Sequence, residues 1–275
     1  INKIITKLNN KEFKSVINTC ENLIESNIEN TIIYNLYGQA YQNLGLYAKS
    51  IPQFEKSIKL NKDNYYALNN LAISLKAIEE YKLSEKAYQK CLKVKPDYTI
   101  AIINYANLKE FLNEFEEAID LYLLAIKFKS EFSEAYVFSK LSRLYLSIGN
   151  LNQARELALK ILKKNPKDTN LYELFSEMAD FKKDKKYLSD MEELYNSKNL
   201  SNNEIINLSF PLGQAYDKSK NYQKAFKFFE RGNKLKRKQI NYSSDNILRL
   251  SESIKKIFKN KELYQVRKKT SDKKI

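Results

Sequence analysis

The sequence predicts an all-α fold, built as a solenoid of short antiparallel helix pairs. The first observation is that small residues return every 34 positions along much of the chain. The second is that structure breakers are scarce, since 275 residues include only five glycines and four prolines. An all-β sandwich or barrel needs many more tight turns than these residues supply. A stack of repeated helical units is therefore expected in place of one central core.

The repeat becomes visible when segments are aligned from Thr31, Tyr65 and Thr99, and then, after a two-residue slip, from Ala135 and Thr169. The eighth residue of each segment is small: Gly38, Ala72, Ala106, Ser142 and Ser176. The twentieth is small in the first four: Ser50, Ser84, Ala118 and Ala154. Position 27 holds Ser57, Cys91 and Ala125, and then Ile161. Three small positions at fixed offsets indicate backbones that approach closely.

Large residues recur between the small ones. Position 17 holds Tyr47, Tyr81, Phe115 and Leu151, and position 24 holds Phe54, Tyr88 and Tyr122. Positions 4, 8 and 11 share one face of a first helix, and positions 20, 24 and 27 share one face of a second. Gly45 and Gly149 are placed to end first helices. Helices of about 12 to 14 residues are marginal alone in water, so each pair needs neighbours.

This period, carried by NLYGQAYQNLGLYAKSIPQFEKSIKLNKDN, closely resembles the tetratricopeptide repeat. The resemblance covers residues 1–168, where the first repeat is incomplete because the chain opens in mid-pattern. It implies a right-handed superhelix of about six repeats with a capping helix at its C-terminal end. It also implies a non-catalytic scaffold that binds a peptide or protein in a concave groove.

The pattern weakens and then returns beyond residue 168. Residues 169–204 form a degenerate helical repeat, which ends at the capping-box spacing of Ser201 and Glu204. Residues 205–242 form a last repeat with a basic extension, and Pro211 predicts a kink or a late start in its first helix. Residues 243–260 predict a capping helix, and residues 261–275 a basic linker or tail. The apolar stripe of that helix comprises Ile247, Leu250, Ile254, Ile257 and Phe258.

The candidate groove comprises positions 2, 5, 9 and 12 of the first helices, which we expect on the concave side. Side-chain amides there can hydrogen-bond an extended peptide, although polar residues line any wet groove. The Lys and Asn set with which some relatives clamp a chaperone's terminal carboxylate is not reproduced, which argues against a chaperone tail. The candidate groove residues are Asn35, Gln39, Gln42, Tyr66, Asn69, Ile73, Lys76, Ile103, Asn107, Glu110, Tyr136 and Arg143.

The net charge of +15 is concentrated near the C-terminus, where residues 216–275 carry 19 Lys and Arg against 6 Asp and Glu. A candidate basic patch comprises Lys234, Lys236, Arg237 and Lys238. It is interpreted as a solvated helix face, or as a surface that attracts an acidic partner. Nucleic-acid binding is disfavoured, because no exposed aromatic platform interleaves with these charges.

Catalytic chemistry finds no support in the sequence. The chain has no histidine, its glycines never cluster, and its adjacent acidic pairs suit solvated helix faces. Cys20 and Cys91 fall on apolar positions and predict buried thiols in a reducing compartment, for which the cytoplasm is expected. No apolar run reaches the roughly 20 residues of a membrane span. We therefore expect no catalytic, metal or cofactor site and no membrane partner.

A second resemblance is carried by KAFKFFERGNKLKRKQINY and ILRLSESIKKIF. Residues 170 to 260 resemble the repeat region of bacterial tetratricopeptide-repeat sulfotransferases. This resemblance implies the alternative function, an N-terminal substrate-recruiting or regulatory arm whose catalytic domain begins after residue 275. The donor 3′-phosphoadenylyl sulfate would then bind only in that domain, and no catalytic residue is carried onto this chain.

Overall fold

The computed structural model describes residues 1–128, 134–240 and 244–259, and these residues form helices without any strand. The chain divides into two compact units, Ile1–Pro166 and Lys167–Ile275, which are described separately. The all-α architecture of consecutive packed helix pairs confirms the predicted fold class.

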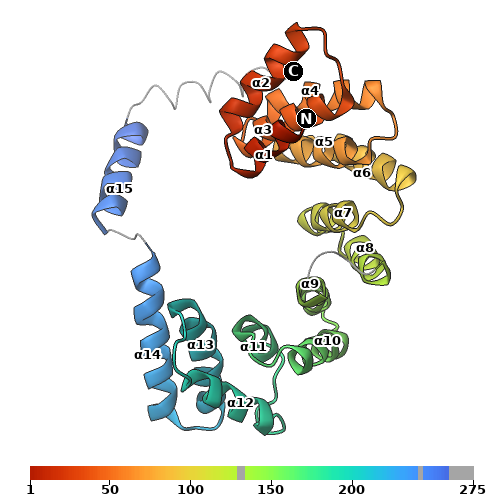
Figure 1. Ribbon diagram of the computed structural model, residues 1–275. Helices are drawn as coiled ribbons and strands as arrows, with labels where there is room; N and C mark the ends of the chain where they lie inside the picture. The colour runs from red at the N-terminus through yellow and green to blue at the C-terminus, as the bar shows by residue number, and fades with distance from the viewer. Residues whose placement is uncertain (129–133, 241–243, 260–275) are drawn as a thin grey trace, which may run out of the picture. The chain divides into compact units, whose positions relative to one another are not determined.

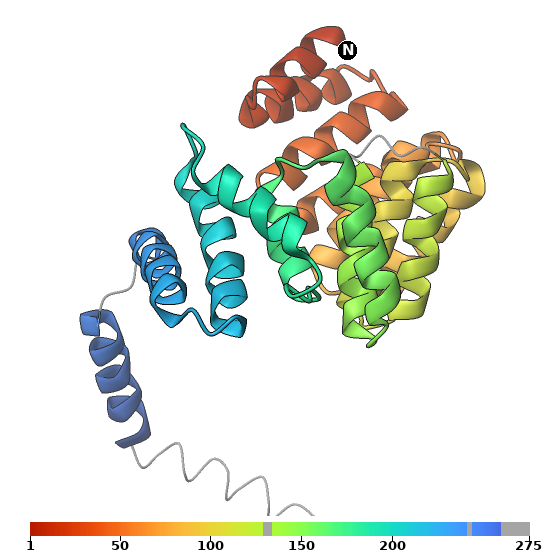
Figure 2. The ribbon, with the colours of Figure 1, turned by 90° about the horizontal axis from the view of Figure 1, so that it is seen from below.

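The first unit contains ten helices in the residues described, and each helix packs against the next. Figure 2 shows α7 to α10, coloured yellow to green, side by side as consecutive pairs. The bounds are α1 (Asn2–Asn9), α2 (Phe13–Glu25), α3 (Thr31–Asn43), α4 (Tyr47–Leu60), α5 (Tyr65–Ala77), α6 (Tyr81–Val94), α7 (Thr99–Phe111), α8 (Phe115–Lys127), α9 (Glu134–Ser147) and α10 (Leu151–Lys164).

The helices begin at fixed positions of the repeat. The first helices α3, α5 and α7 begin at Thr31, Tyr65 and Thr99, the residues from which the segments were aligned, and α9 begins one residue before Ala135. Second helices begin at the residues of position 17 in all four of these repeats. Gly45 and Gly149 have φ angles of +73° and +77°, so each ends its helix in the left-handed conformation that glycine adopts without strain.

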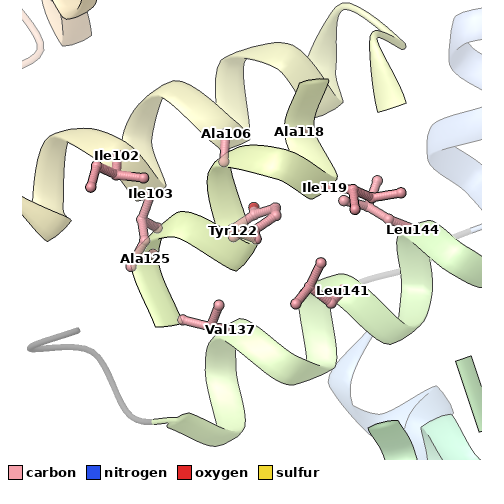
Figure 3. Close-up of a cluster of buried hydrophobic side chains, with 10 residues drawn as sticks. All are labelled: Ile102, Ile103, Ala106, Ala118, Ile119, Tyr122, Ala125, Val137, Leu141 and Leu144. Carbon is pink, nitrogen blue, oxygen red and sulfur yellow. The ribbon is translucent and has the colours of Figure 1, made fainter. Parts of the chain in front are cut away.

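The core of the first unit confirms the packing of small residues against rings. Ala72, Ala106 and Ala118 have no exposed surface. In Figure 3 the ring of Tyr122 lies among aliphatic side chains of α7, α8 and α9. Gly38 shows why position 8 must be small: a Cβ there would lie 2.5 Å from Cε1 of Phe54, the position-24 residue of the same repeat. The period therefore records a contact between the two helices of each pair.

The second unit contains α11 (Thr169–Ser176), α12 (Lys185–Tyr195), α13 (Asn202–Lys218), α14 (Tyr222–Gln239) and α15 (Ser244–Lys259). Ser201 and Glu204 form the predicted capping box at the start of α13. This helix continues through buried Pro211, so the predicted late start is wrong. A Cβ on Gly213 would lie 2.5 Å from the Phe229 ring, the same contact that Gly38 makes in its own repeat. The last repeat therefore has the packing of the earlier ones.

Helix α15 corrects the prediction of a capping helix. The helix forms as expected, but its apolar stripe is not buried against the preceding repeat. Ile254 is 45% exposed and Phe258 is 68% exposed, and Ile247, Leu250 and Ile257 are also exposed. Sequence amphipathicity predicts a helix and its apolar face, but it does not determine what covers that face. The predicted tail, residues 261–275, lies outside the described residues.

Among the described residues, no helix combines the length and apolar character needed to cross a membrane.

Candidate functional site

The candidate groove lies on the first helices of the pairs in the first unit. In Figure 1, α7 and α9 lie on one face of this unit, with α8 on the opposite face. In the first of these pairs, position 8 of the first helix is directed at the second helix, since a Cβ on Gly38 would meet the Phe54 ring, and residues on the other side of the first helix face away from that contact. The residues predicted to line the groove, at positions 2, 5, 9 and 12, differ widely in how exposed they are.

Four asparagine side chains connect three first helices in a ladder of hydrogen bonds. Nδ2 of Asn104 on α7 donates to Oδ1 of Asn69 on α5 at 3.1 Å. Nδ2 of Asn69 donates to Oδ1 of Asn70 at 3.2 Å, and Nδ2 of Asn70 donates to Oδ1 of Asn35 on α3 at 3.1 Å. Asn69 and Asn70 each donate one hydrogen bond and accept one, Asn104 donates one and Asn35 accepts one, which holds the side chains in fixed orientations.

A second inter-repeat contact lies beside this ladder. Nε2 of Gln42 donates to the main-chain oxygen of Asn70 at 2.9 Å and to Oγ of Ser74 at 2.8 Å. Ser74 in turn shares a 2.7 Å hydrogen bond with buried Ser50. Gln42 therefore tethers the end of α3 to α5, and this predicted groove residue has a structural role within the solenoid.

A depression of about 570 Å³ lies between α5, α7 and α9. Lys76 lies in it, with Nζ 3.3 Å from the main-chain oxygen of Asn107 and 5.3 Å from the centre of the Phe111 ring. Burial lowers the pKa of Lys76, although Glu110 acts in the opposite direction. Lys140 and Glu110 form an ion pair of 3.0 Å at its edge. The depression thus combines aromatic surface with a partly desolvated ammonium group.

Tyr122 supports this depression from the core. Its hydroxyl group donates to Oδ1 of Asn107 at 2.7 Å and approaches Glu110 at 3.1 Å. Burial is the main cause that raises the pKa of Tyr122, so the phenol stays protonated and remains a donor. The hydrogen bond from Tyr122 therefore fixes the orientation of the Asn107 amide, with Oδ1 toward Tyr122 and Nδ2 away from it.

The predicted groove residues divide into three groups. Ile103 is 1% exposed and packs in the core with Leu141, so its prediction as a contact residue is wrong. Asn69 is 3% exposed and acts only within the ladder. The others are accessible in the structure, either half-buried or exposed: Asn35, Gln39, Gln42, Tyr66, Ile73, Lys76, Asn107, Glu110, Tyr136 and Arg143.

Sequence reasoning missed four residues of this face. Asn70, Asn104 and Lys140 all occupy position 6 of their repeats, which was not among the positions expected in the groove. Polar residues at one offset in three successive repeats were the signal that would have found them. Phe111, at position 13, is 56% exposed, and its aromatic side chain at an expected helix end carried no comparable signal.

A cluster of acidic residues lies away from the depression. Carboxylate oxygens of Glu85, Glu114 and Glu117 lie within 4.8 Å of one another. Nζ of Lys109 occupies the space between them, at 2.5 to 2.7 Å from each. Burial opposes the charged form, but the three hydrogen bonds raise the pKa of Lys109 above its ordinary value. This arrangement is an internal ion-pair network with its cation already supplied by the protein.

The basic patch lies on α14 in the second unit. Lys234, Lys236, Arg237 and Lys238 are exposed there, on the last two turns of the helix. Nζ of Lys236 lies 5.3 Å from the centre of the Phe210 ring. Lys234 and Lys238 line a shallow depression of about 370 Å³ with Arg231, Glu230 and Leu235. The structure therefore places the four predicted residues on one helix without a built site around them.

Comparisons with known proteins support the repeat. A model of the tetratricopeptide repeat matches residues 32–64, 65–98 and 210–239. Among curated protein sequences, none matches this chain significantly.

Solved structures with the same fold include three that illustrate the similarity. The C-terminal part of a TPR repeat-containing protein from Cytophaga hutchinsonii is 16% identical, with a TM-score of 0.66, covering 85% of this chain and 94% of that one. A tetratricopeptide repeat protein from Parabacteroides merdae is 14% identical, with a TM-score of 0.58, covering 91% and 95%. YrrB, a TPR protein with an unusual peptide-binding site, is 17% identical, with a TM-score of 0.50, covering 66% and 91%.

Proposed function

We propose that this chain is a protein-interaction scaffold whose first-helix face binds an extended peptide segment of a partner protein. The observation that carries the proposal is the asparagine ladder across α3, α5 and α7. In an extended peptide, main-chain N–H and C=O groups need partners along the whole bound length. A row of amides held in place by one another meets that need at little cost in side-chain entropy.

The ladder and the residues beside it leave several hydrogen-bonding groups without a partner in the part of the protein that the structure describes. Among the described residues, Nδ2 of Asn35 and Nδ2 of Asn107 donate to no protein acceptor, and neither does the side chain of Gln39. Oδ1 of Asn104 likewise accepts no hydrogen bond there. These groups supply both donors and acceptors, which a peptide main chain requires.

The depression at Lys76 gives the groove a place for one peptide side chain. Ile73 and Phe111 supply apolar surface, while Lys76 and Asn104 supply polar groups. Mixed apolar and polar lining is typical of sites that fix both the position and the identity of a ligand. That a neighbour in fold, YrrB, is described as having a peptide-binding site agrees in class with this proposal.

The proposal assigns no reaction to this chain, in keeping with its lack of histidine and of clustered glycines. A cytoplasmic location remains a prediction from its cysteines. The resemblance of residues 170 to 260 to sulfotransferase-associated repeats also stays a prediction, because none of the matches described above involves a sulfotransferase.

The test uses peptides selected from a random display library on the whole chain, with affinity measured by fluorescence anisotropy. Asn35→Asp and Asn107→Asp keep the oxygens that accept from Asn70 and Tyr122, while each replaces an outward donor by a charged acceptor. We expect the double variant to weaken binding about tenfold, which corresponds to one or two lost hydrogen bonds.

The matched control is the double variant Asn61→Asp, Asn221→Asp, which adds the same two negative charges and keeps the oxygens that accept from the main-chain N–H groups of Asp63 and Lys224. It should leave affinity unchanged. Equal binding by wild type and the double variant, or equal weakening by the control, would contradict the proposed groove.

A further inference from the structure

A second groove lies between the second helices α4 and α6, with α5 below them. Its volume is about 670 Å³, and its floor is apolar. Leu68 and Leu75 of α5 are 3% and 8% exposed at the bottom, and Ala87 of α6 is 5% exposed. Leu83 and Val94 lie at the two ends of α6 and are 48% and 36% exposed. The groove therefore follows α6 from Leu83 to Val94, a length of about 16 Å.

Five lysines line the rim of this groove: Lys59, Lys62, Lys86, Lys90 and Lys93. All five are exposed, and Glu55 is the one acidic residue among the lining residues. Across the described parts of the chain, none of the five lysines takes part in an ion pair or a side-chain hydrogen bond. The rim thus carries a strong local positive charge that the protein does not neutralise.

The lysine rim belongs only in part to the repeat pattern, because position 29 holds lysine in four repeats: Lys59, Lys93, Lys127 and Lys163. Lys86, Lys90 and Lys93 recur once per turn along α6. One repeat later, 34 residues on, the same positions hold Asp120, Leu124 and Lys127. Helical repetition therefore accounts for the groove and for some of its lysines, whereas Lys86 is particular to this repeat.

We propose that this groove binds an acidic amphipathic helix of a partner protein. A three-turn helix matches the length of the groove, its apolar face can reach the leucines of α5, and acidic residues on each turn can pair with the lysines on both sides. The site is separate from the first-helix groove, because it lies on the opposite helices of the same pairs.

Two other occupants fit the same features less well. A flat bilayer surface cannot reach Leu68 and Leu75, because these residues lie at the bottom of the groove below the lysines. A single fatty-acid anion carries one carboxylate, so four of the five lysines would keep their charges unpaired. A helix with several carboxylates satisfies both the recessed floor and the multiple cations.

The test uses a labelled synthetic peptide of about 18 residues, long enough for helix formation, with a leucine stripe flanked by glutamates. Anisotropy is measured with the whole chain. We expect saturable binding that weakens as salt is raised and that falls at least tenfold in the triple variant Lys86→Glu, Lys90→Glu, Lys93→Glu. A peptide with lysines in place of the glutamates should prefer this variant over wild type.

The matched control carries the same change in charge on exposed lysines of the second unit: Lys182→Glu, Lys186→Glu and Lys198→Glu. It should bind the acidic peptide as wild type does, and so should the Asn35→Asp, Asn107→Asp double variant. Circular dichroism verifies that each variant is folded.

Several results would overturn the proposal. These are no binding of the acidic peptide at millimolar concentration, equal binding of the acidic and basic peptides by wild type, or equal loss in both triple variants. Lysine-dependent sedimentation with phosphatidylglycerol vesicles, without peptide binding, would assign the groove to a membrane surface. Displacement of the peptide by equimolar dodecanoate would assign it to an acyl anion.

Discussion

Replacing Lys109 by methionine gives the most demanding test of how the first unit is held together. The lysine side chain is 4% exposed, and its ammonium group lies between carboxylates of Glu85, Glu114 and Glu117. Glu85 comes from α6, Glu114 from the turn between α7 and α8, and Glu117 from α8. Methionine keeps most of the apolar volume of the side chain but removes the charge that links these three segments.

The magnitude follows from the geometry of the carboxylates. Once the ammonium group is gone, oxygen atoms within 4.8 Å of one another repel. Each pair costs about 1 kcal/mol at a dielectric constant of 80 and about 3 kcal/mol at 20. The carboxylates of Glu114 and Glu117 are 42% and 61% exposed and can turn toward water. We therefore expect a loss of about 2–4 kcal/mol, near the lower end of the range for breaking a buried pair.

The loss of stability in the Lys109→Met variant should depend on pH. In wild type the pKa of Glu85 is lowered: burial opposes this, but hydrogen bonds from Lys109 and Tyr105 outweigh it. That stabilisation is present above the ordinary pKa of about 4.5 and is lost as pH falls through the folded value. In the Lys109→Met variant Glu85 loses its hydrogen bond from Lys109 and is repelled by the neighbouring carboxylates, so protonation of Glu85 reduces the repulsion. The deficit of the variant should therefore be largest at pH 7 and shrink toward pH 4.

The assay is urea denaturation followed by far-ultraviolet circular dichroism at several pH values, since urea adds no salt that would screen the charges. Adding Glu85→Gln to the variant should recover part of the lost stability, whereas Glu85→Gln alone should destabilise wild type. A deficit below about 1 kcal/mol, or one that grows as pH falls, would refute the assignment of Lys109 as the central cation.

Two further predictions concern the buried contacts of the repeat. Gly38→Ala should lower the free energy of unfolding by about 1–3 kcal/mol, because the added methyl group overpacks against Phe54. Adding Phe54→Leu should partly restore that free energy, as measured by urea titration. The comparison variant Gly45→Ala places its methyl group in open space, so it should cost only about 1 kcal/mol, from the positive φ of this residue. The thiols of Cys20 and Cys91 should react with Ellman's reagent at pH 8 only after urea is added. Both side chains are buried, and burial raises their pKa values to about 11 and about 12. Rapid reaction in the native state would show instead that the thiols are accessible.

The sequence by itself determined the helix pairs and the period at which they recur. Residues such as Gly38, Ala72 and Ala106 touch a partner in the same repeat, and that contact recurs with every unit. A contact that repeats along the chain leaves a period in the sequence, and the starts of α3, α5 and α7 recur with that period. The capping box at Ser201 was equally readable, because it depends on residues only three positions apart.

The tertiary structure decided which side chains are buried, paired or left exposed. Ile103 looked like a groove residue, but it is buried in a core cluster to which α8 and α9 also contribute. Lys109 lies at position 11, where two other repeats have Tyr41 and Leu75. The sequence around Lys109 gives no indication that its ammonium group pairs with three glutamates.

The same holds for the lysines around the groove of α6 and for the stripe of α15. Their significance depends on what the neighbouring segments bring, or fail to bring, into contact. Packing within a helix pair is periodic, so it can be predicted from the sequence. Charge pairing and exposure are set by neighbours from different repeats, and only their arrangement in space determines them.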